Sequence, residues 1–448
     1  MRYVSTRGGV APVSFRSAVM MGLAEDGGLL VPERVPSVGP ARSGYAELAL
    51  EVMRPFADDV PELDELIRAA YALETYLGPV APLRPVGDRF VLELFHGPTL
   101  AFKDVALQLL GRLFESTLAL QGGRLNILAA TSGDTGSAAI SGVRGRAGIQ
   151  IFVMHPRGRV SRVQELQMTS VTDPNVHNLA IRGTFDDCQA LLKRLSSDLE
   201  FKRRCSLGAV NSVNWARVLA QTVYYFAAFH QLGTERVSFC VPTGNFGDVL
   251  AGWYAARMGL PVARLAVATN TNDILSRFFA TGEYSLGAVE PTLAPAMDIQ
   301  VASNFERYLY YRMGEDPSRV AAAMREFAAT GRLKVEGEDP LWAAGRATRE
   351  DILRTIREVH DRHGTVLDPH TAVGWHVASQ LELPPPVVCL ATAHPAKFPE
   401  AIREATGRDD LARHPRVEAL EGLPTRCTVL DASEQAVRDY LSSCCAPA

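Results

Sequence analysis

Short apolar runs alternate along the chain with longer segments of helical periodicity, and a small polar or glycine-rich stretch separates the two. In the clearest case, LNILAA is followed by TSGDTG and then by SAAISGVRG. An apolar run, a polar turn and a small-residue helical pattern predict strand, loop and helix in that order. The same order recurs in RVSFCVPTGNFGDVLAGWYAARMG, GIQIFVMHPRGRVSRVQELQMTSV, ARLAVATNTNDILSRFFATG and PVVCLATAHPAKFPEAIREATG.

Strands that are apolar on both faces and alternate with helices are typical of parallel sheets. We therefore predict an α/β fold with two helix-covered, mainly parallel sheets. Ligands of such sheets bind at the carboxyl ends of the strands, so the function is expected to lie in the loops that follow them.

The length of 448 residues indicates more than one domain. We expect an N-terminal segment, 1–102, that contributes partly to the large domain, a smaller α/β domain, 103–218, and a large α/β domain, 219–448. The stretch EVHDRHGTVLDPHTAVGW, in which His, Gly and Pro interrupt the periodicity, is predicted to be a linker or a surface excursion.

The composition points to small-molecule partners. The chain carries 46 basic and 50 acidic side chains, with no basic stripe that would indicate nucleic-acid binding. Its seven cysteines are scattered, without zinc spacing, which fits reduced thiols in the cytoplasm. The N-terminus lacks the apolar core of a secretory signal, and no run has transmembrane length. We expect a cytoplasmic protein that binds neither a membrane nor a metal ion.

Lys103 is the first candidate for chemistry. It stands in FHGPTLAFKDVALQLLG at the start of a predicted helix whose apolar positions indicate inward packing. Most lysines at such positions are solvated. Burial and the positive end of the helix dipole would both lower the pKa of this amine and favour the free base that forms a Schiff base.

Two glycine-rich loops could bind anions. PTGNFGD, at 242–248, follows an apolar run and opens a helix, so its main-chain N–H groups can converge on a phosphate. ATSGDTGSAA, at 130–139, has the same character, but Asp134 would repel an anion unless it caps the helix. Each loop alone could also be an ordinary turn. Together with a reactive lysine, the loops suggest pyridoxal phosphate in one and an anionic substrate in the other.

Four motifs in this order, FHGPTLAFKD, TSGDTG, VPTGNFGD and TAHPAKFPE, closely resemble the threonine synthase family of fold type II pyridoxal-phosphate enzymes. YVSTRGG and GLAEDGGLLVPERVP resemble the N-terminal region of the same family. The resemblance extends from Tyr3 to about Glu400.

The resemblance implies roles for residues at the cofactor. Lys103 would form the Schiff base with pyridoxal 5'-phosphate, and Lys397 is its rival. Thr392 would face the pyridine nitrogen, and Asp134 stands where related enzymes often have an asparagine beside the 3-oxygen of the cofactor, so its role stays open. The remaining cofactor-binding candidates are those expected at the phosphate, namely Gly244, Asn245, Phe246, Gly247 and Asp248.

The implied substrate is O-phosphohomoserine. Its carboxylate would lie at the loop that contains Ser132, Gly133 and Thr135. Its phosphate would bind to donors in NSVNWARVLAQ, of which Arg217 is the strongest because a guanidinium can hold two oxygens; the others are Asn211, Ser212 and Asn214, with Arg157 and Arg159 as lesser candidates.

The implied activity is a β,γ-elimination and replacement that gives L-threonine and phosphate, the last step of threonine biosynthesis, in a monomer or homodimer. Three alternatives remain at this point. The first is a related lyase or dehydratase that releases a keto acid. The second is a ligand-binding relative without catalysis, against which Lys103 argues. The third is a nucleotide-binding protein, for which the motif lysine is missing.

Overall fold

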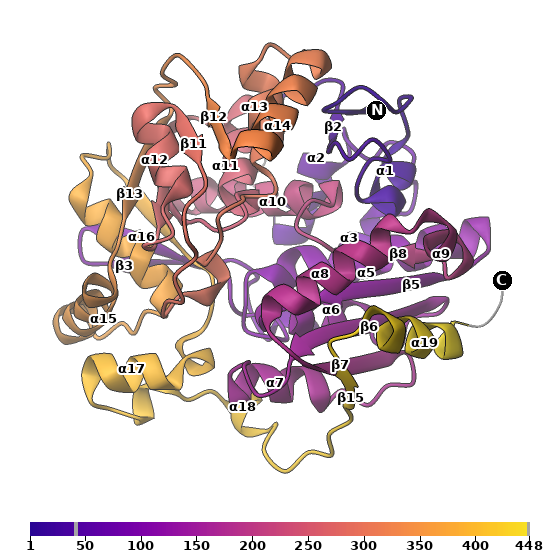
Figure 1. The fold of residues 1–448 in the computed structure, drawn as a ribbon. Helices are drawn as coiled ribbons and strands as arrows, with labels where there is room; N and C mark the ends of the chain where they lie inside the picture. Colours follow the sequence, from indigo (N-terminus) through magenta and orange to yellow (C-terminus); the bar gives the residue numbers. More distant parts are fainter. Residues whose placement is uncertain (40–43, 446–448) are drawn as a thin grey trace.

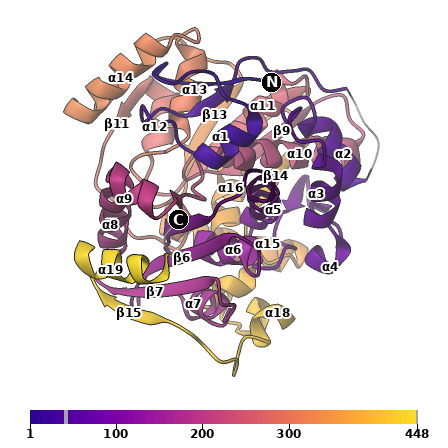
Figure 2. The same ribbon diagram turned by 90° about the vertical axis from the view of Figure 1, so that its right-hand side faces the viewer.

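Two mainly parallel sheets, each with helices on both faces, form the two halves of the molecule (Figures 1 and 2). The structure is a computed structural model that describes residues 1–39 and 44–445. It confirms the α/β fold expected from the alternation of apolar runs and helical patterns. All five predicted strand-loop-helix units are present.

The larger sheet has six strands in the order β13-β10-β9-β14-β4-β3. All neighbouring pairs are parallel except β3 with β4, which form an antiparallel pair at one edge. Its strands are β3 (Leu83–Val86), β4 (Arg89–Glu93), β9 (Val237–Pro242), β10 (Val262–Thr269), β13 (Trp342–Arg346) and β14 (Val387–Ala391).

The central strand β9 is buried on both sides, as its continuous apolar sequence predicts. Phe239 and Val241 belong to the core cluster that includes helices α10 (Trp215–Leu232) and α11 (Gly247–Arg257). Cys240, which points to the opposite face because side chains alternate along a strand, packs in the core with helices α15 (Arg349–His363) and α16 (Pro369–Gln380). Both faces of the sheet are therefore covered.

The smaller sheet has five parallel strands in the order β15-β7-β6-β5-β8. Helices α5 and α6 cover one face, and α8, α9 and α19 cover the other. The elements of this half are α5 (Lys103–Gln121), β5 (Leu125–Ala130), α6 (Asp134–Val143), β6 (Ile149–Pro156), α7 (Arg162–Thr169), β7 (Val176–Arg182), α8 (Phe185–Ser197), α9 (Leu199–Arg204), β8 (Leu207–Gly208), β15 (Thr428–Asp431) and α19 (Glu434–Cys444).

The C-terminal segment differs from the expected division, which put all of 219–448 in the large unit. Strand β15 pairs in parallel with β7, and α19 packs against α8, so the chain returns to the smaller sheet (Figure 1). Val437 and Leu441 of α19 are completely buried there. Strand β15 therefore covers a sheet edge, and α19 covers an apolar face, that the segment 103–218 leaves open.

The remaining elements surround these sheets. Two small antiparallel pairs join β1 to β2 and β11 to β12. Among the helices that the structure describes, none combines the length and apolar character needed to cross a bilayer. These elements are β1 (Tyr3–Ser5), α1 (Phe15–Met21), β2 (Leu30–Pro32), α2 (Tyr45–Met53), α3 (Leu63–Ala70), α4 (Leu73–Tyr76), α12 (Ile274–Thr281), β11 (Glu283–Ser285), η1 (Pro295–Met297), α13 (Phe305–Arg312), α14 (Pro317–Thr330), β12 (Arg332–Lys334), η2 (Pro395–Lys397), α17 (Pro399–Thr406), η3 (Asp410–Ala412) and α18 (Pro415–Glu418).

The prediction of a linker at 358–375 is wrong. The segment contains the end of α15, a short turn and the first half of α16. Asp368 caps α16 by accepting the N–H groups of His370 and Thr371, and Pro369 occupies the first helical position, where it needs no N–H partner. The His, Gly and Pro residues therefore mark the boundary between two helices, where the exposed residues 361–364 lead into the buried start of α16.

The contact between α5 and α6 provides a test of the packing. A Cβ atom added at Gly111 of α5 would lie 2.0 Å from the carbonyl oxygen of Gly142 in α6. Alanine at 111 gains about 1 kcal/mol in helix propensity, but the forced separation of two helices costs more, so we expect Gly111→Ala to destabilise the protein by about 2 kcal/mol. Chemical denaturation measures this value.

The control is Leu120→Ala on the exposed side of the same helix, where 69% of the side chain is accessible. It should change the free energy of unfolding by less than about 0.5 kcal/mol. A Gly111→Ala protein as stable as the wild type would contradict the tight contact.

Candidate active site

The end of strand β14 fixes the approach of the chain to Lys103. The main-chain N–H of Phe102 donates to the carbonyl of Thr392 at 2.9 Å, and that of His394 donates to the carbonyl of Leu100 at 3.0 Å. Ala101 and Ala393 form an isolated antiparallel bridge between the same segments. Lys103 therefore begins its helix directly beside Thr392.

The HGPT turn is held by Asp104. Its carboxylate accepts the main-chain N–H and the hydroxyl of Thr99, both at 2.8 Å. A Cβ atom at Gly97 would lie 2.5 Å from the same carboxylate, so only glycine allows this close approach. Burial raises the pKa of Asp104 to about 6, although the hydrogen bonds from Thr99 oppose the shift.

The side chain of Lys103 is buried, with 8% of the residue exposed. Its Nζ lies 3.6 Å from Oδ2 of Asp134 and 4.7 Å from the ring centroid of Phe102. Burial lowers the pKa of Lys103; Asp134 opposes this shift, whereas the positive charges of Lys397 and Arg217 add to it. The position thus favours the neutral, nucleophilic form of the amine.

Asp134 does not act as a helix cap. It is the first residue of α6, and its Oδ1 accepts a hydrogen bond from Gln164 at 2.8 Å and forms an ion pair with Lys397 at 3.0 Å. Burial raises the pKa of its carboxyl, but the charges of Lys397 and Lys103 outweigh this effect and hold the pKa well below its usual range. Asp134 is therefore ionised.

The loop 243–247 forms a glycine cradle between β9 and α11. Phe246 adopts a left-handed backbone conformation with φ of 65°, which turns the chain sharply into the helix. Its ring packs against Phe305 and Trp342, with centroids 5.5 Å away in each case. A Cβ atom at Gly244 would lie 2.4 Å from the carbonyl oxygen of Ala296, so no side chain fits there.

Asp248 follows the cradle in the first turn of α11. Its Oδ1 accepts the hydroxyls of Tyr224 at 2.5 Å and Tyr225 at 3.0 Å, while its buried Oδ2 has no hydrogen-bond partner. Burial raises the pKa of Asp248 to about 6 against the effect of these two hydrogen bonds and of Lys103. A carboxyl of this kind can carry a proton and donate it towards an anion.

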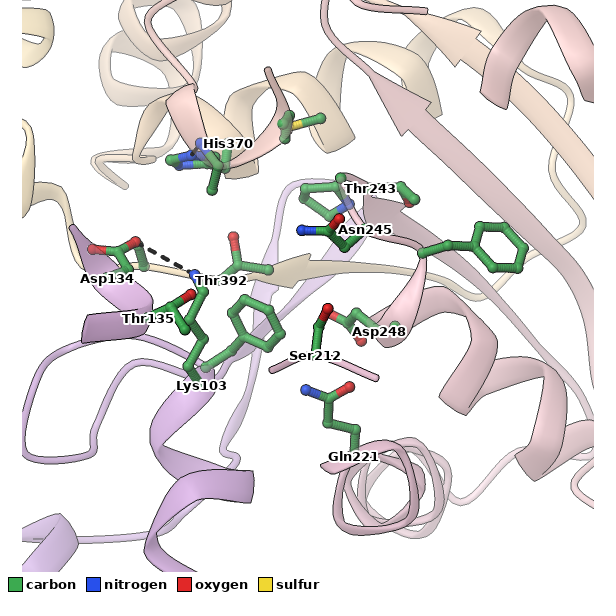
Figure 3. Close-up of a pocket in the computed structure, with 18 of the residues that line it drawn as sticks. Lys103, Asp134, Thr135, Ser212, Gln221, Thr243, Asn245, Asp248, His370 and Thr392 are labelled. Atoms are coloured by element: carbon green, nitrogen blue, oxygen red, sulfur yellow. Dashed lines mark hydrogen bonds and ion pairs between the residues drawn. The ribbon is translucent and has the colours of Figure 1, made fainter. Parts of the chain in front are cut away.

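Lys103 and the glycine cradle line one pocket, although they lie far apart in the sequence. The pocket encloses about 720 Å³, including the part open to solvent. Figure 3 shows Lys103 and Asp134 on one side and Asn245 and Asp248 on the other, with Thr392 between them.

His370 and Gln221 also line the pocket, and sequence reasoning missed both. His370 is buried, its Nδ1 lies 2.9 Å from Oδ1 of Asp368, and its Nε2 accepts the N–H of Ala296 at 3.3 Å. Because Nε2 faces a donor, the ring proton lies on Nδ1 and points to the carboxylate. The sequence Asp368-Pro369-His370 could have indicated this position, because an Asp followed by a Pro is typical of a helix start and would place His370 in the first turn.

The structure brings only some of the substrate-binding candidates together. Thr135, Ser212 and Arg217 line the pocket. Arg217 is 3% exposed and donates from Nη1 to the carbonyl of Val210, whereas its buried Nε has no partner. Burial lowers the pKa of this guanidinium to about 10, which leaves it charged at neutral pH.

Four other candidates lie outside the pocket lining. The amide of Asn214 caps α10 and donates to the carbonyl of Val19, so both ends of this side chain are occupied. The N–H of Gly133 donates to the hydroxyl of Thr131. Ser132 is half-buried in the same loop, and Asn211 is exposed, as are the lesser candidates Arg157 and Arg159.

The residues present fit pyridoxal phosphate. The glycine cradle lies at the pocket and opens α11, where the main-chain N–H groups of a helix start suit a phosphate, and Gly244 lets the turn pack against the carbonyl of Ala296. Lys103 offers a buried amine of lowered pKa, which suits an aldehyde. Arg217 Nε and Asp248 Oδ2 are buried polar atoms without partners among the described residues, and they indicate that the pocket accommodates a polar ligand.

Comparison with known families gives three consecutive matches. Residues 2–71 match the threonine synthase N terminus, 85–338 match the pyridoxal-phosphate-dependent enzyme family, and 371–441 match the C-terminal region of threonine synthase.

Individual relatives agree. The chain is 46% identical to a threonine synthase of Pseudomonas aeruginosa, over 99% of this chain and 98% of that protein. It is 42% identical to the one of Schizosaccharomyces pombe, over 90% and 89%. Among solved structures, the pyridoxal-phosphate-bound threonine synthase of Brucella melitensis superposes with a TM-score of 0.95 at 44% identity and covers 99% of both chains. The yeast enzyme gives 0.93 at 37% identity, with 98% of both chains covered.

The cradle can be tested by filling it. We expect Gly244→Ala to weaken the binding of pyridoxal phosphate to the apo-protein about tenfold or more, because the new methyl group must displace the main chain at Ala296. An absorbance titration measures the dissociation constant. Gly39→Ala, at a position where no atom of the described residues lies within 4 Å of the added Cβ, is the control and should bind as the wild type does. Equal affinity of the two variants would exclude the cradle as the phosphate site.

Proposed function

This chain belongs to the threonine synthase family of pyridoxal-phosphate-dependent enzymes, and on that basis we propose that the pocket between its two sheets is the active site. The chain converts O-phosphohomoserine and water to L-threonine and phosphate. The observation that carries the assignment of the site is the buried amine of Lys103 in the same pocket as the glycine cradle.

In our proposal the glycine cradle binds the phosphate of the cofactor, and the amine of Lys103 binds the aldehyde carbon of the cofactor covalently. Pyridoxal phosphate supplies an aldehyde that condenses with amines and a ring that withdraws electrons from the attached substrate. Thr392, which lines the pocket, would offer its hydroxyl to the ring nitrogen. A hydroxyl leaves this nitrogen less protonated than an aspartate would, so the reaction depends more on acids and bases that the protein positions.

The substrate would lie between the N-terminal turn of α6 and the start of α10. The N–H groups and hydroxyl near Thr135 suit its carboxylate, since the helix dipole favours an anion there. Ser212 and Arg217 suit its phosphate, and the buried Nε of Arg217 is a donor without a protein partner. The positions of Asn211 and Asn214 make them weaker candidates than Arg217.

Each proton transfer then needs a base at a defined place. Lys103 would be released as a free amine once the amine of the substrate has replaced it on the cofactor, and it could then move a proton from Cα and afterwards from Cβ of the substrate. Arg217 would stabilise the charge on the phosphate as it leaves Cγ. Water that adds at Cβ must lose a proton, and the phosphate, retained near Arg217, can accept it.

A related lyase or dehydratase would share the cofactor contacts and differ in its product. Full-length matches to threonine synthases favour the synthase over these alternatives. All seven cysteines are free in the structure, which supports the proposed cytoplasmic location. We retain a monomer or homodimer as the proposed oligomeric state.

The activity has a direct test. The wild-type protein should form threonine and phosphate in equal amounts from O-phosphohomoserine, without keto acid. Lys103→Ala should lose at least about 10³-fold in rate, because both covalent attachment and proton transfer need the amine. Borohydride reduction followed by mass spectrometry should find the cofactor on Lys103.

The exposed Lys193 gives the matched control, and Lys193→Ala should retain full activity. Phosphate released together with a keto acid would instead identify a lyase, and a label on another lysine would refute the assignment of Lys103.

The phosphate site can be tested at Arg217. Arg217→Lys keeps the charge and loses the forked donor, so we expect KM for O-phosphohomoserine to rise about tenfold or more, with affinity for pyridoxal phosphate unchanged. Steady-state kinetics measures KM, and an absorbance titration measures the affinity. The exposed Arg159, changed to Lys, should leave KM unaltered. If Arg159→Lys raised KM and Arg217→Lys did not, the phosphate of the substrate would bind at the 157–159 turn instead.

A further inference from the structure

Lys397 is a second buried lysine beside the pocket, and the steps above give it no task. It ends the short helix η2, and the whole residue is buried. Its Nζ lies 2.6 Å from the carbonyl oxygen of Thr99, 2.8 Å from Oε1 of Gln167 and 3.0 Å from Oδ1 of Asp134. A neutral amine has only two N–H bonds, and its lone pair would face the third oxygen. The geometry therefore requires the protonated ammonium.

The two carboxylate oxygens of Asp134 contact different lysines at different distances. Its Oδ1 is bound by Lys397 at 3.0 Å and by Gln164 at 2.8 Å. Its Oδ2 lies 3.6 Å from the amine of Lys103, which is longer than a normal N–H···O hydrogen bond. The carboxylate therefore has its charge compensated and its direction fixed without Lys103.

We propose that Lys397 is a positioning residue that compensates the charge of Asp134 and fixes its Oδ1, so that Lys103 keeps only a long contact to Oδ2 and remains an uncharged nucleophile and base. The inference rests on the proposed covalent role of Lys103. It also gives Asp134 a role as the link through which Lys397 acts.

The electrostatic consequence has a definite sign. Burial and the charges of Lys397 and Arg217 favour the neutral form of Lys103, whereas Asp134 favours its ammonium form. If the charge of Lys397 is removed, Asp134 can pair only with Lys103 among the two lysines. The pKa of Lys103 must then rise, so a larger fraction of the amine is protonated at neutral pH.

Other charged or titratable groups face this cluster and stay in place when Lys397 changes. His370, whose Nε2 accepts the N–H of Ala296, faces Asp134, and Asp104 interacts with Lys397. Arg217 and Asp248 face Lys103 from α10 and α11. Because these groups are common to every variant below, differences between variants report on Lys397 and Asp134.

The test compares Lys397→Met, which removes the charge, with Lys397→Arg, which keeps it. The first measurement is the rate at which the apo-protein captures pyridoxal phosphate as a function of pH, and the second is the pH dependence of the visible absorbance of the loaded protein. We expect Lys397→Met to move both midpoints upward by about 1 to 3 pH units. Lys397→Arg should restore most of the shift, and the exposed-site control Lys193→Met should keep the wild-type midpoints.

A folded Lys397→Met protein with wild-type midpoints would overturn the proposal, as would an equal shift in Lys397→Arg. Thermal unfolding shows whether each variant folds. If Lys397→Met does not fold, Asp134→Asn is compared with the wild type, because this variant removes the link and keeps Lys397. Both midpoints should move downward, since the carboxylate that favours the ammonium form of Lys103 is gone; unchanged or higher midpoints would overturn the proposal.

This outcome is separable from failure of the proposed function. The function fails if the wild type makes no threonine or carries the cofactor on a lysine other than Lys103. The role of Lys397 is therefore tested only after the wild type has been shown to make threonine and to carry the cofactor on Lys103.

Discussion

The structure depends on one buried carboxylate that is shared between two lysines. Asp134 follows a strand of the smaller sheet, whereas Lys397 follows β14 of the larger sheet and Lys103 begins the helix that crosses from the larger sheet to the smaller one. Their ion pairs therefore join the carboxyl ends of the two sheets, and Figure 3 shows Lys103 beside Asp134. A buried charge is costly unless it is paired. In our proposal, the same interaction that joins the halves also influences the protonation of the amine in the pocket.

Features that depend on neighbouring residues could be predicted from the sequence. The strand-loop-helix units follow from apolar runs and glycines within a single segment, and the structure contains each of them. Lys103 and the cradle at Gly244 were also recognisable locally, since a lysine before an amphipathic helix and a glycine-rich turn after a strand each have a chemical meaning. What joined them into one site was the fold type, because strand ends of parallel sheets meet at a common edge.

Features that depend on tertiary contacts could not be predicted in this way. His370 stands in a segment whose Gly and Pro indicate a break, and only its burial against the larger sheet places it in the pocket. Asn214 has the composition of a phosphate ligand, but its side chain caps a helix. Strand β15 is short and half-exposed, and its pairing with β7 is a long-range choice that no local pattern encodes. Lys397 was visible as an amine, but its three acceptors come from segments distant in sequence.

The two sides of the pocket use different means to handle charge, and this difference suits their tasks. On the side of the larger sheet, main-chain groups around Gly244 and Phe246 form the cradle, and their dipoles are fixed by the fold. Phe246 adopts a strained left-handed conformation, which the packing of its ring against Trp342 helps to offset. On the opposite side, Lys103 and Asp134 are titratable. In the proposed function, the cradle side would anchor the phosphate of the cofactor mainly through main-chain groups, with Asp248 as its titratable neighbour, and the side of Lys103 would carry the proton transfers.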